Sequence, residues 1–152
     1  MQNEALRRLT ISLTSNRPYE GNASDDISKL TKACRVTTTK LADVMDILWM
    51  RLRNGKSQWK PALLSLYILR NLILHGPITA ISEAMTGLEK IRELKKYQSS
   101  NKANSAQVQT TAKNIYSLLV DRSRLFMLRR AYATRRKAVS NNKPSQVSIS
   151  FL

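Results

Sequence analysis

The chain has few of the residues on which most catalytic sites depend. Its 152 residues include one cysteine, Cys34, one histidine, His75, and ten acidic residues. A nucleophile with its base, a carboxylate pair or a metal centre needs more such groups, and neither a Cys-x-x-Cys nor a His-x-x-x-His pattern occurs. The four glycines, at 21, 55, 76 and 87, are isolated, which excludes a glycine-rich phosphate loop. We therefore expect no enzyme, no metal site and no cofactor.

The lone cysteine and the lone histidine have simple structural interpretations. Cys34 is expected to be a small buried apolar side chain. His75 stands at the end of an apolar helical segment, where the C-terminal dipole of the helix suits a partly positive imidazole. A structural cap is therefore expected there in preference to a catalytic group.

Long apolar runs are also missing. The longest, residues 61–74, is interrupted by Arg70 and is well short of the ~20 residues that span a bilayer. One cysteine cannot form an internal disulfide, and the segment after Met1 lacks the apolar core of a secretory signal. We expect a cytoplasmic protein with no membrane-spanning segment. Binding at a membrane surface stays open, because it needs only positive charge or an amphipathic helix.

The scarcity of acidic residues leaves a large positive charge. The chain has 26 Lys and Arg against 10 Asp and Glu, a formal net charge of +16 and a pI of about 10.6. A partner with an anionic surface is the expectation. Nucleic acid is the least favoured of such partners, because aromatic residues make up only 6% of the chain and no basic–aromatic platform is evident.

Apolar residues recur with helical periodicity along most of the chain, and no strand pattern competes with it. The fold class is therefore all-α, in one domain over residues 1–139, with residues 140–152 expected as a disordered tail or linker. The stretch 14–24 is rich in turn formers, and Ser24 or Asp25 can cap the helix that follows it. Ser105 is the expected cap of a later helix. The predicted helices are 3–13, 26–34, 38–53, 58–75, 78–97 as one or two helices, about 105–119, and 121–138.

The segment 58–75 is apolar almost all round, which places it at the centre of a helical assembly. Pro61 falls in its first turn, where proline is tolerated, and Gly76 is its expected C-terminal cap. A basic turn precedes it. Positive charge is thus concentrated at the entrance of the central helix.

Two groups of cations stand out in the first half of the chain. Several charge-assisted hydrogen bonds can converge from such groups on a phosphate, and a helix N-terminus adds free backbone N–H groups. The alternative, that these residues are merely solvated helix faces, stays open. The candidate anion-binding residues are Arg51, Arg53, Lys56 and Lys60 around the predicted turn, and Arg7, Arg8 and Arg17 around the first helix and its exit loop.

A second basic surface is expected near the C-terminus. No acidic residue follows Asp121, and uncompensated like charges on a helix repel, which an anionic partner would relieve. The simpler alternative is that Leu125 and Tyr132 pack inward while the arginines face water. The residues of this surface are Arg122, Arg129, Arg130, Arg135, Arg136 and Lys137.

Several segments, in order along the chain, resemble those of one known family of helical domains. Residues 14–21, Thr-Ser-Asn-Arg-Pro-Tyr-Glu-Gly, are similar to the loop of that family that typically reads Thr-Ser-Asn-Asp-Pro-Trp-Gly. Residues 47–52, Ile-Leu-Trp-Met-Arg-Leu, resemble its Ile-Trp-Lys-Arg-Leu segment. The helix from Trp59-Lys60 to Leu74-His75-Gly76 resembles its Trp-Arg…Tyr-Leu-Ile-Lys-Thr-Gly helix. Similarity continues over residues 88–97, 112–119 and 121–129. Together these segments resemble the epsin N-terminal homology (ENTH) domain.

The resemblance implies a fold and a function. The fold is a compact right-handed superhelix of about seven or eight helices, of the ENTH, ANTH and VHS kind. The function is that of a trafficking adaptor module that binds phosphoinositide head groups on a cytosolic membrane surface, in clathrin-type vesicle formation or endocytosis. Clathrin or adaptor-complex proteins would be bound through other parts of a longer protein. The matching site positions are Asn16, Arg51, Lys56 and Lys60.

The sequence departs from the family pattern at several positions. Epsins have an inserting amphipathic helix before the first core helix, whereas residues 3–13 align with the core helix itself. The family's His and Lys in the first turns of the central helix correspond to Pro61 and Leu64, and its cation in the first core helix corresponds to Ile11. These departures support an alternative function, a divergent protein-docking scaffold without specific lipid binding. Either way we expect a peripheral protein at the plasma membrane, at endosomes or at Golgi-derived vesicles.

Overall fold

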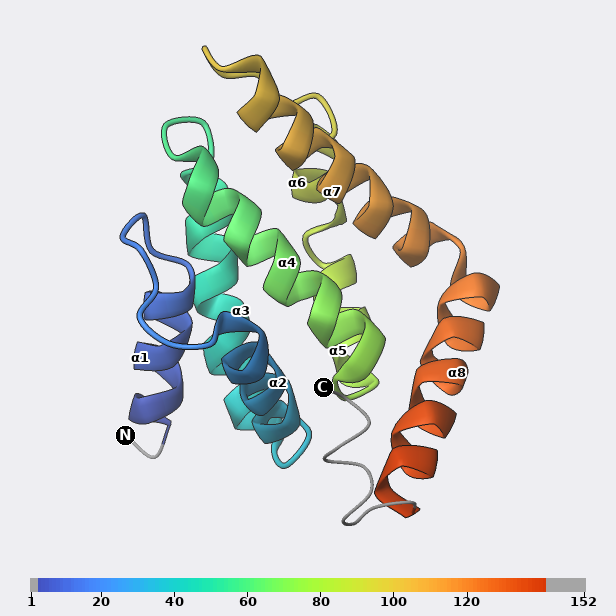
Figure 1. The fold of residues 1–152 in the computed structure, drawn as a ribbon. Coiled ribbons are helices and arrows are strands. Elements are labelled where there is room, and N and C mark those ends of the chain that lie inside the picture. Colours follow the sequence, from blue (N-terminus) through green and yellow to red (C-terminus); the bar gives the residue numbers. More distant parts are fainter. Residues whose placement is uncertain (1–2, 142–152) are drawn as a thin grey trace.

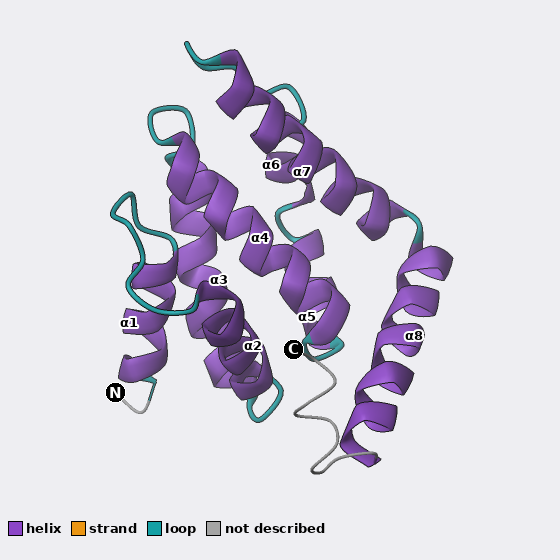
Figure 2. Cartoon of the chain, in the orientation of Figure 1, coloured by secondary structure: helices purple, strands orange, loops and turns teal. Residues whose placement is uncertain are grey.

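The computed structural model describes residues 3–141, and the side chains of residues 3–139. All the regular elements in that range are helices, so the predicted all-α class is confirmed. Figures 1 and 2 show their arrangement. The helices are α1 (Glu4–Leu13), α2 (Ala23–Cys34), α3 (Thr38–Arg53), α4 (Trp59–His75), α5 (Thr79–Met85), α6 (Leu88–Leu94), α7 (Lys102–Val120) and α8 (Arg122–Asn141).

Two helices begin earlier than the sequence predicts, and for the same reason. Asn22 accepts a hydrogen bond from the Asp25 backbone N–H at 3.1 Å, so α2 begins at Ala23. Asn101 accepts one from the Asn104 N–H at 3.0 Å, so α7 begins at Lys102. In both places an asparagine two to four residues upstream of the predicted cap accepts from one of the free N–H groups. Ser24 and Asp25 are therefore not the caps of α2.

Ser105, the predicted cap of α7, is instead buried inside the helix, where its hydroxyl accepts from the Ser99 backbone N–H at 2.8 Å. Residues 78–97 form two helices, α5 and α6, which separate at Thr86 and Gly87. The last helix, α8, continues to Asn141, so the first two residues of the predicted tail are helical. The rest of that segment, 142–152, lies outside the described residues.

The centre of the assembly is α4, as its apolar sequence predicts. It packs against α2, α3, α5, α7 and α8 (Figure 1). Leu66, Ile68, Leu69 and Leu72 have no exposed surface. Each fully buried side chain of this size stabilises the fold by about 1.5–3 kcal/mol relative to an exposed one. The helix ends at Gly76, where a Cβ would lie 2.6 Å from the Leu72 carbonyl oxygen.

The direction of three helices places the candidate sites. The side chain of Arg7 on α1 reaches Asp43 on α3, and Arg51 further along α3 reaches Ile11 and Thr14 at the end of α1. The two helices are therefore parallel. α4 follows α3 after a short turn, and its 17 residues rise about 25 Å. The α3–α4 turn and the C-terminus of α4 thus lie at opposite ends of the central helix.

Candidate anion-binding site

The loop between α1 and α2, residues 14–22, is fixed at both of its ends. At its start, the Thr14 hydroxyl donates to the Thr10 carbonyl at 2.8 Å and is buried. Near its end, the Tyr19 hydroxyl donates to the Asp26 carboxylate in the first turn of α2. This contact, together with burial, raises the pKa of Tyr19. The loop therefore has a defined position, on which cations from other helices can converge.

Arg51 joins α3 to the end of α1. Its Nε donates to Thr14 Oγ1 at 3.0 Å, and its Nη2 donates to the Ile11 carbonyl at 3.1 Å. Carbonyls at the end of a helix lack intrahelical partners, so this guanidinium satisfies one of them. A guanidinium has five N–H donors, and three remain for another acceptor.

Lys60 reaches the same loop from the first turn of α4. Its Nζ donates to the Asn16 carbonyl at 3.4 Å. Arg17, the next residue in the loop, is exposed. Arg51 and Lys60, which follow Arg17 by 34 and 43 residues in the sequence, thus lie with it at one end of the molecule. We call Asn16, Arg17, Arg51, Lys56 and Lys60 the loop-and-turn surface.

The α3–α4 turn, which contains Lys56, is anchored by a residue that follows α6 in the sequence. The buried Tyr97 hydroxyl donates to the Gly55 carbonyl at 2.7 Å. Burial raises the pKa of Tyr97. Gly55 is itself buried, while Lys56 and Arg53 on either side of it are exposed. The anchor therefore leaves both cations facing solvent at the edge of the loop-and-turn surface.

An open hollow of about 700 Å³ lies between α1 and the loop. Ser12 and Ser15 contribute hydroxyls to its wall, Arg17 a cation and Glu20 a carboxylate. Ile11, also in the wall, is 42% exposed. The positions that depart from the family pattern differ in exposure: Pro61 is buried, whereas Leu64 is half-buried. The hollow therefore offers hydroxyls, one cation and one carboxylate, and the other cations of the surface come from the α3–α4 turn and the helices on either side of it.

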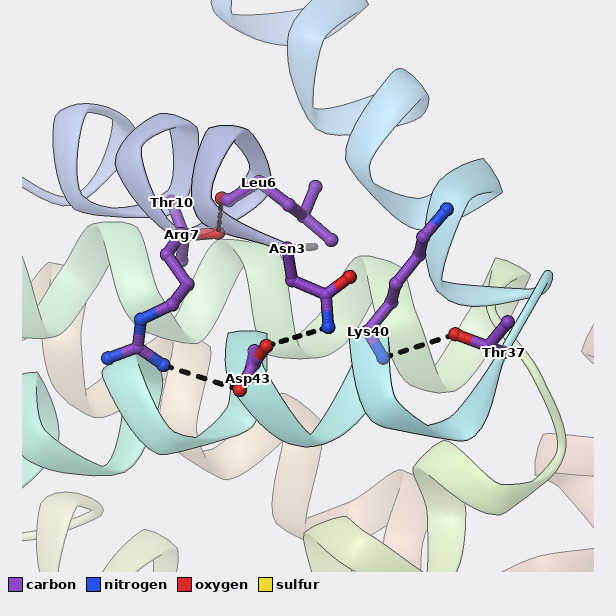
Figure 3. A network of polar contacts seen from close by, with 7 residues as sticks. All are labelled: Asn3, Leu6, Arg7, Thr10, Thr37, Lys40 and Asp43. Carbon is purple, nitrogen blue, oxygen red and sulfur yellow. Dashed lines mark hydrogen bonds and ion pairs between the residues drawn. The ribbon is translucent and has the colours of Figure 1, made fainter. Parts of the chain in front are cut away.

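The predicted group at Arg7 and Arg8 is engaged elsewhere. Arg7 pairs with Asp43 at 3.5 Å, and the same carboxylate accepts from Asn3 at 2.8 Å (Figure 3). Arg8 pairs with Glu4 one turn earlier on α1, at 3.1 Å. Asp43 and Arg51 are eight residues apart on α3, which is about 12 Å of rise. The structure therefore places Arg7 and Arg8 outside the loop-and-turn surface and gives each an acidic partner.

The second predicted basic surface divides into two kinds of residue. Arg130 and Lys137 are exposed on α8, and Arg122 donates to the Leu119 carbonyl at the end of α7. In contrast, Arg129 donates to the Ile73 and Gly76 carbonyls at 2.7 and 2.8 Å, and Arg136 lies 2.8 Å from His75 Nδ1. The simpler alternative, that the arginines of α8 only face water, does not describe Arg129, which is half-buried, and Arg136 is exposed but also contacts His75.

The charge state expected for His75 is also corrected. Burial lowers its pKa, and the neighbouring guanidiniums of Arg136, Arg35 and Arg129 lower it further. The cations outweigh the helix dipole that suggested a partly positive imidazole. His75 is therefore neutral near pH 7.

Three residues that the sequence did not single out matter at these surfaces: Arg35, Asn71 and Tyr97. Arg35 at the end of α2 donates to the His75 carbonyl, and Asn71 on α4 accepts from Thr31 at 2.7 Å. Each acts across a separation of about 40 residues, so no local pattern could indicate its partner.

Other kinds of site find no support in the part of the chain that the structure describes. Over residues 3–141, no three His, Cys, Asp or Glu side chains are grouped to hold a metal ion. Within the same range, none of the helices combines the length and apolar character that crossing a bilayer requires.

The fold and this surface define a class: an all-α domain of stacked helices that presents converging cations at one end. The family model for the ENTH domain matches residues 4–125, and the chain belongs to the ENTH domain family. Solved domains of this family are α-superhelices, which confirms the predicted superhelical fold. The resemblance to this family seen in the sequence is confirmed as well.

Known relatives are similar to this chain over most of its length. Human ENTH domain-containing protein 1 is 28% identical over 134 residues, which is 85% of this chain and 21% of that protein. The chain thus spans about a fifth of the length of this relative. The ENTH domain of ENT2 from Candida albicans is 28% identical, with a TM-score of 0.76 over 86% of this chain and 98% of the other. The epsin-2 ENTH domain, solved with phosphatidylinositol 4,5-bisphosphate, is 21% identical, with a TM-score of 0.74 over 84% and 90%.

Proposed function

We propose that this ENTH domain is the membrane-binding module of a trafficking adaptor and that it binds phosphoinositide head groups at a cytosolic membrane surface. The observation that carries the proposal is the convergence of Arg51 and Lys60 on the 14–22 loop, beside the exposed Arg17 and Lys56. Phosphate groups favour such convergence because several charge-assisted hydrogen bonds form at once. The solved complex of the epsin-2 domain with a phosphoinositide supports the ligand class.

The binding energy expected from charge alone indicates how the loop-and-turn surface would bind a membrane. A basic residue near an anionic leaflet contributes about 1 kcal/mol, so four of them contribute about 4 kcal/mol, which corresponds to a Kd of about 1 mM. Charge alone is then too weak for stable recruitment. Hydrogen bonds from the three remaining N–H groups of Arg51 and from Lys60 to one head group would supply the rest. The proposal therefore requires selectivity for a phosphoinositide over a leaflet of equal charge.

Clathrin or adaptor-complex proteins are the proposed partners of a longer protein that includes this domain. The domain itself acts by binding, at the plasma membrane, endosomes or Golgi-derived vesicles. An alternative is a protein-docking scaffold without specific lipid binding. It is favoured by the apolar residues Pro61 and Leu64 at positions where the family has ligand-contacting residues, and by the hydrogen bonds that already occupy part of Arg51.

The test is co-sedimentation with phosphoinositide vesicles at physiological ionic strength. The informative variant is Lys56→Glu/Lys60→Glu, because the Lys56 side chain makes no hydrogen bond or ion pair in the described residues and Lys60 makes one long hydrogen bond. Arg51 is a poorer choice, since its loss also removes contacts to α1. The matched control is Lys32→Glu/Arg130→Glu, which makes the same charge change at exposed positions near the other end of α4.

We expect the Lys56/Lys60 variant to lose at least tenfold in vesicle affinity, and the control to stay within about twofold, because contact energies of 1.4 kcal/mol correspond to a factor of ten. Equal losses in the two variants would mean that only net charge matters. Absence of binding by the unmodified domain would leave the docking scaffold as the function.

A further inference from the structure

We propose a second anion site, a pocket between α2, α4 and α8 that binds a small molecule bearing phosphate monoesters, of the inositol phosphate class. The pocket has a volume of about 470 Å³, within the range typical of small-molecule sites. The residues that carry the argument are Arg35, Asn71, His75, Tyr132, Arg135 and Arg136, all in its wall. It opens at the C-terminal end of α4, about 25 Å along that helix from the loop-and-turn surface.

The pocket is surrounded by positive charge. Arg35, Arg135 and Arg136 line the pocket, Arg129 lies beside it, and none of the described lining residues is acidic. The helix C-terminus contributes roughly half a negative charge, which four guanidiniums exceed. Mutual repulsion is strong enough to lower the pKa of both Arg129 and Arg136, after the larger effect of burial. A bound anion would relieve this repulsion.

Two of the cations, Arg35 and Arg129, are held in place before any ligand binds. Arg129 donates to the Ile73 and Gly76 carbonyls, and Arg35 donates to the His75 carbonyl. These bonds satisfy the free carbonyls at the end of α4 and fix two guanidiniums at the pocket edge. Preorganisation of this kind reduces the entropic cost of binding.

The pocket wall also supplies hydrogen-bond donors. Arg136 can only donate, so His75 Nδ1 accepts and the proton of the neutral imidazole is on Nε2, a further donor. Asn71 Oδ1 accepts from Thr31, which leaves the Nδ2 group of Asn71 for another acceptor. Arg135 stacks 5.7 Å from the centre of the Tyr132 ring. Guanidinium, imidazole and amide donors suit phosphate oxygens.

His75 makes this site easy to observe, because it is the one histidine of the chain. Its ring is in the pocket wall, so the histidine ring signal in a proton NMR spectrum reports on this site. The probe is soluble inositol 1,4,5-trisphosphate, added to the Lys56→Glu/Lys60→Glu protein. That background removes cations of the loop-and-turn surface, so failure of this site and failure of the proposed membrane function are distinguishable.

We expect a saturable shift of the His75 signal and a rise in its pKa, because a nearby anion offsets the effect of Arg136, Arg35 and Arg129. In the same background, calorimetry should show that the Arg135→Gln/Arg136→Gln variant binds inositol 1,4,5-trisphosphate at least tenfold more weakly. The matched control is Arg130→Gln/Lys137→Gln, which removes two exposed cations of the same helix and should bind within about twofold. Circular dichroism melting confirms that the variants are folded.

Binding without a shift of the His75 signal would overturn the proposal, as would equal losses in the pocket variant and its control, or no binding at all. A second arm identifies the source of the phosphate groups. If vesicles containing phosphatidylinositol 4,5-bisphosphate displace the soluble probe from His75, the pocket accepts a lipid head group. If they do not, its ligand is soluble. Both results support the site.

Discussion

The Arg51 guanidinium donates to the Thr14 hydroxyl at 3.0 Å and so joins the third helix to the end of the first. The same residue is in the loop-and-turn surface that we propose binds lipid. On this proposal the side chain has two roles, because two of its donors stabilise the fold and three are left for a ligand. This dual role decides how mutations at the surface must be interpreted.

Replacing Arg51 is expected to destabilise the domain. Arg51→Met removes hydrogen bonds to Thr14 and to the Ile11 carbonyl, and we expect the free energy of unfolding to fall by about 1–3 kcal/mol. Urea denaturation followed by circular dichroism measures this change. The control is Arg53→Met, an exposed arginine two residues away, which should stay within about 0.5 kcal/mol. Equal effects at the two positions would show that the contacts to α1 do not contribute.

The Tyr97 hydroxyl is expected to stabilise both the domain and the α3–α4 turn. Tyr97→Phe leaves the buried Gly55 carbonyl without its partner and should cost about 1–3 kcal/mol. Amide hydrogen exchange at residues 54–58 should accelerate, because this bond anchors the turn that contains Lys56. Tyr116→Phe, which keeps a ring beneath Lys95, is the control. Unchanged exchange in the turn would show that it is held by other contacts.

The stability of the domain is expected to fall as the pH drops through the range in which histidine titrates. The pKa of His75 is lowered in the folded state, so the unfolded chain binds more protons and stability rises with pH. The contribution is complete above the unfolded pKa of about 6.5 and is lost as the pH falls toward the lower folded value. His75→Gln should flatten the dependence of the melting temperature on pH between about 7.5 and 5.5. An equally steep dependence in His75→Gln would assign it to other groups.

Sequence patterns predicted the elements well because helices depend on local features. The helix 58–75 is recognisable from its apolar surface, from Pro61 in its first turn and from Gly76 at its end, and the structure differs by one residue. The positions of Asn22 and Asn101 show the limit of that approach, since several polar residues in a row compete to cap a helix.

The candidate sites were less predictable because they depend on contacts between distant segments. Arg51 and Lys60 were recognised as candidates, but their hydrogen bonds to the 14–22 loop span about 40 residues. Arg7 was recognised as a candidate in the same way, yet in the structure it forms an ion pair with the Asp43 carboxylate on α3. The pocket at the end of α4 brings together Arg35 and Arg136, which are 101 residues apart in the chain. No periodic pattern encodes such proximity.

The thiol of Cys34 is expected to be inert in the folded domain. Burial raises its pKa to about 11, so the thiolate that reacts with labelling reagents is scarce at pH 8 and is also shielded from them. A maleimide or disulfide reagent at that pH should label native protein slowly and urea-unfolded protein rapidly. Rapid labelling of the native protein would show that the α2 end of the core opens frequently.

The central claim is that the loop-and-turn surface recognises a phosphoinositide head group in addition to negative charge. The most direct measurement is the partitioning of the unmodified domain between buffer and two sets of vesicles at physiological ionic strength. One set contains a phosphoinositide, and the other contains enough phosphatidylserine to give the same surface charge. We predict at least tenfold tighter binding to vesicles with the preferred phosphoinositide. Equal binding to both sets, for every phosphoinositide tested, would contradict the account.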